Sequence, residues 1–304
     1  MNLNASPVGT GAAGGLLSTA LGKTYTGTIN GLVPFQSNSY DSLQTKLTRK
    51  FTNGSSFGFV WTLSRALDYE DNEELNSLSF PYPAYWQKNY GPASFDRTNN
   101  FQIYGVMQLP FGKGQHWVKE GVGSYILGGW QLSPIITVMS GLPFTVTAAS
   151  GLANSNGSIE TANLIAPFNV SNGQPNQSYA PCSSAGCQYF NPAAFASPAQ
   201  NTLGNTNRDQ FRGPGYFNMN LSLAREFRIT ERVGFQVRAD AIALTNTPHF
   251  ANPNASCGNN AANPTSCTAS NANFGLITGT LQPGGFFGPD PGSRVLWLGA
   301  RLNF

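Results

Sequence analysis

Apolar and polar residues alternate over long stretches of this chain, and this period of two constrains its fold more than any other feature. In the closing run RVLWLGARLNF, one side of an extended strand carries Leu296, Leu298, Ala300, Leu302 and Phe304, while the other side is mixed. Similar alternation predicts seven strands, at residues 40–51, 56–67, 97–110, 128–147, 217–227, 232–244 and 294–304. The fold class is therefore all-β.

Alternation alone fits a soluble β-sandwich, with apolar residues inside and polar residues outside. Two features favour an antiparallel transmembrane β-barrel instead. The polar sides carry mainly Asn, Gln, Ser and Thr, and only 10% of the residues are charged, against about 25% in ordinary domains. The predicted strands are also long, since about 9 to 11 tilted residues span a bilayer whereas ordinary strands have about 5 or 6.

The links between these strands alternate between short and long, as expected where periplasmic turns are tight and extracellular loops are long. The turns at 52–55 and 228–232 then lie on the periplasmic side, and the loops at 148–216 and 245–293 lie outside the cell. The link 111–127 is longer than a periplasmic turn usually is. An eighth strand at 16–29 would make the count even, although its alternation is poor.

Several classes of function find no support in the sequence. No apolar run reaches the roughly 20 residues of a membrane helix, and the N-terminus lacks the pattern of a secretory signal. A net charge of +3 without a Lys/Arg cluster argues against nucleic-acid binding. No catalytic or cofactor motif is present, so we expect neither an enzyme nor a cofactor. We expect solvent to surround the acidic residues of LDYEDNEEL, which are Asp68, Glu70, Asp71, Glu73 and Glu74.

Four cysteines fall in the loops that this topology places outside the cell. Cys182 and Cys187 enclose four residues, and Cys257 and Cys267 enclose nine. An oxidising location favours two local disulfides, although four cysteines allow three connectivities. We expect no metal site, because the spacing is not that of zinc ligands and the two histidines, His116 and His249, lie in different links.

Several ordered segments resemble the barrel of TonB-dependent outer-membrane receptors, in particular the Oar-like group with a carboxypeptidase-regulatory-like domain. The resemblance covers about residue 38 to the end and is carried by NSYDSLQTKLTRKFTNGSSFGFVWTLSRALD, GPASFDRTNNFQIYGVMQLPFGKGQ, LGGWQLSPIITVMSGLPFTVT, NPAAF, RGPGYFNMNLSLAREFRITERVGFQVRADAIALTNTPHFANPN and LGARLNF. Residues 38–304 would form the C-terminal part of the barrel, with about seven or eight spanning strands, and residues 1–37 a loop or partial first strand.

The resemblance implies a location in the outer membrane of a Gram-negative-type bacterium, surrounded by lipid. It also implies that Phe304, with Leu302 and Ala300, is read by the barrel-assembly machinery. Members of the family have 22 strands and a plug, so we expect a longer receptor whose N-terminal region carries the signal peptide, the plug and the contact with the TonB system. The inner wall would carry the charges of Lys46, Arg238, Asp240 and Arg301.

Two functions follow from these expectations. In the first, the extracellular loops capture a ligand, such as an oligosaccharide, a peptide or a metal complex, for energised import through a plugged barrel. In the second, the barrel displays its loops for adhesion or assembly, without active transport. A secreted soluble β-sandwich is a third and weaker alternative. The sequence identifies neither the substrate nor the oligomeric state.

Overall fold

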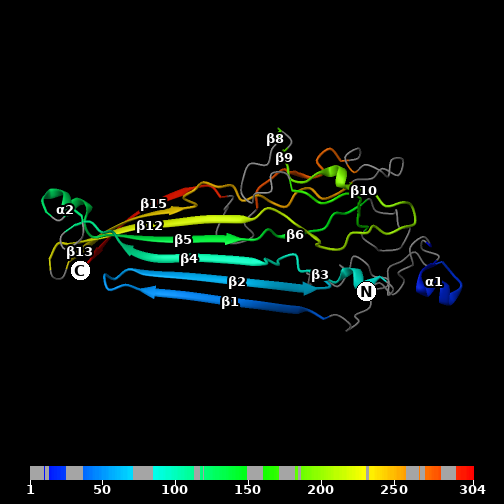
Figure 1. Ribbon diagram of the computed structural model, residues 1–304, viewed down its shortest axis with the longest axis horizontal. Helices are drawn as coiled ribbons and strands as arrows, with labels where there is room; N and C mark the ends of the chain where they lie inside the picture. Colours follow the sequence, from blue (N-terminus) through cyan, green and yellow to red (C-terminus); the bar gives the residue numbers. More distant parts are fainter. Residues whose placement is uncertain are drawn as a thin grey trace.

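A computed structural model describes the chain at residues 10, 14–24, 37–70, 85–112, 117–118, 120–148, 160–170, 182–183, 186–230, 233–257, 267, 271–281 and 292–304. One large antiparallel sheet forms one end of the molecule, and a cluster of ordered loops forms the other (Figure 1). The predicted all-β fold is confirmed. None of the helices in these ranges is long and apolar enough to cross a membrane.

The large sheet is a meander in which each long strand pairs with the next long strand along the chain. Its seven long strands have between 9 and 13 residues, and a short strand, β3 (Gly91–Pro92), pairs with the end of the second. In sheet order they are β1 (Ser39–Lys50), β2 (Ser56–Asp68), β4 (Asn99–Gln108), β5 (Trp130–Met139), β12 (Tyr216–Arg228), β13 (Gly234–Ile242) and β15 (Val295–Asn303).

All seven predicted strands are present, but one is shorter than predicted, and the possible eighth strand is not found where the structure describes its residues. The strand expected at 128–147 ends at Met139, and the chain leaves the sheet where Gly141 approaches Gly213, whose carbonyl oxygen a Cβ at Gly141 would meet at 1.9 Å. The possible eighth strand at 16–29 is absent from its described part, residues 16–24. That part contains the helix α1 (Leu16–Leu21), which ends at Gly22 in the left-handed conformation.

Pro134 lies at an interruption in the pairing of β5 with β4. Tyr104 pairs with Ile135 and Met107 pairs with Leu132, but no pairing joins the residues between them on β4 and β5. Proline has no backbone N–H to donate to a neighbouring strand. The β4–β5 ladder therefore breaks at Pro134 and resumes in the same register.

The register places apolar side chains on one face of the sheet and most of the polar side chains on the other. One row across five strands joins Leu47, Phe59, Ile103, Ile136 and Met219, and the neighbouring row joins Lys46, Val60, Gln102, Thr137 and Asn218. We call these two faces the apolar face and the polar wall. Apolar residues on the first face are partly or fully exposed, and Leu298 has 86% of its surface accessible. Such a surface is expected to contact lipid.

Successive links between the long strands lie at opposite ends of the sheet. The β1–β2, β4–β5 and β12–β13 links lie at the end of the sheet that holds the C-terminus, and the longer links lie at the opposite end (Figure 1). Strands β1 and β15 form the two edges of the sheet, and no described strand pairs with their outer sides. The described sheet is therefore open.

The long links after β5 and β13 fold together into a unit that we call the loop module (residues 140–215 and 243–294, where described). Its short elements pair outside the main sheet and bury a shared core. They are β6 (Pro143–Phe144), β7 (Asn163–Leu164), β8 (Cys182–Ser183), β9 (Gly186–Gln188), η3 (Pro192–Ala194), β10 (Phe195–Ala196), β11 (Phe211–Arg212) and β14 (Leu276–Ile277).

Candidate functional site

The loop module is held together by a cluster of phenylalanine rings. Phe168 and Phe211 have ring centroids 4.8 Å apart, and Phe195 packs edge-on against Phe211 at 5.2 Å. Phe190 packs edge-on against Phe274 at 5.2 Å, and both rings are almost fully buried. Offset and edge-to-face ring pairs stabilise a core beyond the area they bury. The loops therefore form a packed unit with its own hydrophobic core.

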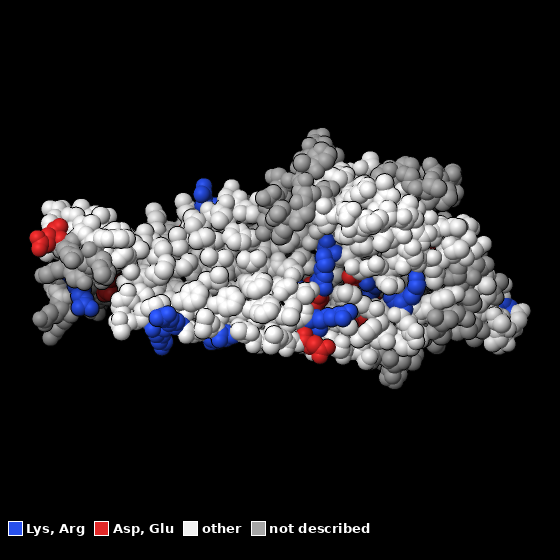
Figure 2. All heavy atoms as spheres, in the orientation of Figure 1, with Lys and Arg blue, Asp and Glu red and all other residues white. Residues whose placement is uncertain are grey.

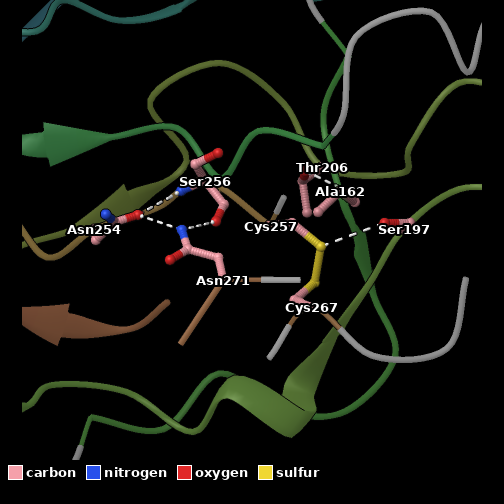
Figure 3. Close-up of a disulfide and its surroundings, with 8 residues drawn as sticks. All are labelled: Ala162, Ser197, Thr206, Asn254, Ser256, Cys257, Cys267 and Asn271. Atoms are coloured by element: carbon pink, nitrogen blue, oxygen red, sulfur yellow. Dashed lines mark hydrogen bonds between the residues drawn. A yellow bond between two sulfur atoms is a disulfide. The ribbon is translucent and has the colours of Figure 1, made fainter. Parts of the chain in front are cut away.

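A disulfide between Cys257 and Cys267 lies inside this core (Figure 3). The two Cα atoms are 4.4 Å apart and both cysteines are 0–1% exposed. The hydroxyl of Ser197 lies 3.5 Å from the Cys257 sulfur. The disulfide closes a loop within the 243–294 part of the module, and its sulfur contacts a residue of the 140–215 part.

Side-chain amides fix the backbone beside this disulfide (Figure 3). The Asn271 amide donates to the Asn254 side-chain oxygen at 3.1 Å and to the Ser256 carbonyl at 2.8 Å. The same Asn254 oxygen accepts the Ser256 backbone N–H at 3.2 Å. Such side-chain to backbone bonds replace the ladder bonds that an irregular segment lacks.

The second pair of cysteines lies in a small hairpin of the module. β8 and β9 place the backbone of Cys182 directly opposite Cys187. Cys187 is disulfide-bonded, and the side chain of Cys182 lies outside the described part of the structure. β14 pairs with β9 and so connects this hairpin to the 271–281 segment.

Buried arginines join the loop module to the rim of the sheet. Arg208 forms ion pairs with Asp68, at the end of β2, and with its neighbour Asp209, and all three side chains are about one-tenth exposed or less. The Arg208 guanidinium also donates to the backbone carbonyls of Asn89, at 2.8 Å, and Asp68, at 2.9 Å. The expectation that solvent surrounds Asp68 is therefore wrong, since its carboxylate is buried against Arg208. The sequence pattern did not indicate this pair, because the two residues are 140 positions apart.

The other expected members of this acidic cluster do not gather in a described site. Asp71, Glu73 and Glu74 lie outside the described residues, and Glu70 is half-buried.

A second pair, of which only the acidic side chain is fully buried, lies close to the first. Arg212 pairs with Asp96, whose side chain is 1% exposed, and donates to the Asp96 carbonyl at 2.8 Å. The other Asp96 carboxylate oxygen accepts the backbone N–H of Ala66, in β2, at 2.7 Å. Figure 2 shows acidic and basic side chains gathered where the strands meet the loops, while most of the strand surface in that view carries neither.

Two further cations lie at this rim. Arg97 donates to the Ser140 carbonyl at 2.7 Å, and Lys88 of η2 (Trp86–Asn89) donates to the Gly204 carbonyl at 2.7 Å. Burial lowers the pKa of both groups. For Arg97 the nearby Tyr216 opposes this shift of the pKa and the charge of Arg212 adds to it. The rim is thus a network of desolvated charges bonded mainly to backbone carbonyls and carboxylates.

All four charges expected on the inner wall lie on the polar wall, but they form no single cluster. Arg238 donates to Asp240 at 2.7 Å and to the Ser222 hydroxyl at 3.2 Å. Arg238, Asp240 and Trp297 line a shallow pocket of about 220 Å³. Arg301 faces Gln236 one strand away, whereas Lys46 lies on β1, at the opposite edge of the sheet.

The last residues of the chain follow the alternation of β15. Leu302 lies opposite Phe235 and Ala300 lies opposite Val237, so both side chains lie on the apolar face. Phe304 is 98% exposed beyond the end of the strand. A role for this ending in barrel assembly stays a prediction.

The described residues offer no cluster of metal ligands. Across the described ranges, no group of three or more His, Cys, Asp and Glu side chains could hold a metal ion. His249 is buried, with Nε2 2.9 Å from the Phe217 carbonyl and its ring 4.0 Å from that of Tyr216. His116 lies outside the described residues.

Sequence reasoning did not find the loop core or the rim. The phenylalanines of the core are scattered from Phe144 to Phe274 without a local period, so no pattern marks them. The same is true of Arg208 and Arg212, because Asp68 and Asp96, with which they pair, precede them by more than 100 residues.

A family model described as "Outer membrane beta barrel domain" matches residues 1–295. Comparison with curated proteins and with solved structures gave no match.

Proposed function

The chain belongs to the outer membrane beta barrel domain family, and from this premise we propose that it is the C-terminal barrel portion of a TonB-dependent receptor of the Oar-like group. Membership of the family implies a location in the outer membrane of a Gram-negative bacterium. The proposed receptor binds a ligand with its extracellular loops and imports it through a plugged barrel. Residues 38–304 supply barrel wall in this proposal, and residues 1–37 precede it.

One observation carries the proposal: the large sheet has a lipid-type face, a polar wall and two open edges. Lipid tails cannot satisfy the backbone N–H and C=O groups of an unpaired strand, so a sheet that spans a membrane must close into a barrel. In the described sheet, β1 and β15 lack outer neighbours. Further strands between these two edges, as in the 22-stranded barrels that the sequence resembles, would complete the wall.

The loop module fits the part of a receptor that first meets its ligand. It lies at the end of the sheet opposite the C-terminus, and its aromatic core and disulfide hold its surface in a fixed shape. A surface that is ordered before binding loses less conformational entropy when it captures a ligand. Its buried arginines would keep this surface in one position over the barrel opening.

The same module favours a second candidate, surface display without transport. A loop unit with its own core can bind a partner on another cell or matrix without any passage through the barrel. The two functions differ in what must fill the barrel. Import requires a plug and a contact with the TonB system, whereas display requires neither.

The reading frame upstream of the Met1 codon tests the choice. An open frame that encodes a plug and further alternating strands supports the receptor, and a stop codon at once in that frame contradicts it. The product of the full frame should then co-purify with the C-terminal domain of TonB, and a version without the first residues of the plug should not. Co-purification that does not depend on these residues would count against energised import.

A further inference from the structure

The link between β4 and β5 contains a short helix, α2 (Val122–Leu127), whose exposed side consists of aliphatic and aromatic side chains. Val122 is 76% exposed, Tyr125 79% and Ile126 62%, a spacing of three and four residues that places them on one side of the helix. Ser124, on the other side, is buried. A helix on a water-covered surface has the opposite arrangement, with its apolar side packed inward.

Close backbone contacts hold α2 in this orientation. Gly112 and Gly128, at the two ends of the link, approach so closely that a Cβ on Gly112 would lie 2.6 Å from the Gly128 Cα. The Gly128 N–H donates to the Ser124 carbonyl at 3.1 Å and closes the helix. Small residues therefore make the close contacts on the packed side, while Tyr125 and Ile126 stay on the exposed side.

Two side chains bind the C-terminal end of α2 to the sheet. The Trp130 indole N–H donates to the Ile126 carbonyl at 2.9 Å. Arg225 donates to the same carbonyl at 2.6 Å and also to the carbonyl of Tyr125. These carbonyls have no partners within the helix, and a guanidinium beside them also complements the negative end of the helix dipole.

These two side chains also identify the side of the sheet on which α2 lies. Trp130 and Arg225 face each other across β5 and β12, two residues before Leu132 on β5 and two after Leu223 on β12. Since alternate residues share a face, Trp130 and Arg225 project from the apolar face. The C-terminal end of α2 therefore lies on the lipid side of the wall.

The position along the strands is equally defined. α2 lies at the end of the sheet that holds the C-terminus and the β12–β13 turn (Figure 1). Aromatic residues occur on the apolar face at this end, where Phe227 and Phe235 are paired neighbours. An aromatic girdle of this kind marks the boundary between lipid and water in outer-membrane barrels.

We propose that α2 is an interfacial anchor, which inserts its apolar side into the periplasmic phospholipid leaflet of the outer membrane beside the barrel wall. The exposed side of α2 continues the apolar face, which contacts lipid in this family, so lipid covers both surfaces. Trp117, 61% exposed in the same link, adds an aromatic side chain of the kind enriched at membrane interfaces. The anchor also explains why this link is too long for a simple periplasmic turn.

Site-specific photo-crosslinking in cells tests the proposal. The full-length protein is expressed in its own outer membrane with the photoreactive residue p-benzoylphenylalanine at one position. Positions 125 and 126 report on α2, and position 298, on the apolar face, is the lipid-exposed reference. The matched control is position 236, since Gln236 lies at the same end of the sheet but on the polar wall, opposite Glu226. Each variant must show the heat-dependent gel shift of a folded barrel.

After irradiation, mass spectrometry of the purified protein identifies what has been captured. We expect phospholipid adducts at positions 125, 126 and 298 and none at 236. Spin-labelled phospholipids in isolated outer membranes give a second measurement, in which a fluorophore at position 126 is quenched most by labels near the headgroup. Adducts at 125 and 126 only with protein, or a label at 126 that no lipid quenches, would overturn the proposal.

Discussion

Arg208 and Asp68, which are 140 residues apart in the sequence, form a buried ion pair where the loop module meets the end of β2. The guanidinium also donates to the backbone carbonyls of Asn89 and Asp68 and pairs with Asp209, so all three of its nitrogens have acceptors. Since β2 is part of the barrel wall, this pair fixes the extracellular loops to the membrane-spanning sheet.

Substitution Arg208→Ala should detach the loop module from the rim. It leaves the Asp68 carboxylate buried without its cation, which costs about 3–5 kcal/mol when a pair of this kind loses one partner. Protease digestion of intact cells should then cleave the external loops much faster than in the natural protein. Arg228→Ala, at an exposed arginine near the periplasmic turn, is the control and should leave the digestion unchanged. Equal digestion of both variants would show that the pair does not hold the module.

Asp96 offers a graded version of the same test. Asp96→Ala removes the acceptors of both the Ala66 N–H and the Arg212 guanidinium, whereas Asp96→Asn keeps one neutral oxygen for the N–H. We expect Asp96→Ala to lower stability more than Asp96→Asn, because a buried donor without a partner costs about 1–3 kcal/mol in addition to the lost pair. The temperature at which each variant loses its folded gel mobility ranks their stabilities. The reverse order would contradict the assigned bonds.

The disulfides should differ in their resistance to reductant. Cys257 and Cys267 are inaccessible to solvent, whereas Cys187 is partly exposed. Mild reduction of the folded protein should therefore open the Cys187 disulfide first, and the Cys257–Cys267 bond only after heating. Alkylation followed by mass spectrometry gives the order of opening. The double variant Cys257→Ala with Cys267→Ala should lose about 3 kcal/mol, as expected for a loop of this length.

Neighbouring residues of β15 test which face meets lipid. Leu298 lies on the apolar face and Trp297 on the polar wall, and both are exposed in the open sheet. Leu298→Arg should cost about 2–4 kcal/mol, the penalty for arginine on a lipid-facing surface near the middle of the membrane. Trp297→Arg should assemble almost normally. The fraction of folded protein in purified outer membranes measures the effect of each substitution. Equal losses for the two variants would argue against the assigned faces.

Gly128→Ala should displace α2. Its Cβ would lie 2.4 Å from the Ser124 carbonyl oxygen and 2.9 Å from the Gly112 Cα, both of them backbone atoms. Overpacking of this kind costs about 1–3 kcal/mol. A fluorophore at position 126 should then change its quenching by lipid spin labels. Gly299→Ala, where a new Cβ meets no atom within 4 Å, is the control and should leave the quenching as it is.

The sequence alone determined the sheet, its two faces and the order of its links. Each of these follows from local patterns, since a strand alternates with period two and short turns join consecutive strands. Six of the seven strands begin and end within about two residues of the predicted positions for this reason, and only the strand predicted at 128–147 ends early, at Met139. A break in pairing at Pro134 is local in the same sense, because a proline has no backbone N–H to donate whatever its neighbours are.

Only the tertiary structure decided how the loops fold and what holds them. The core from Phe144 to Phe274, the pairs of Arg208 and Arg212 with distant carboxylates, and the contact of Arg225 with α2 all join residues that are far apart in the chain. No local period records such contacts, because their free energy arises only when folding removes these groups from water. The sequence therefore specified the wall, and long-range packing determined the loop module, its attachment to the rim and the position of α2.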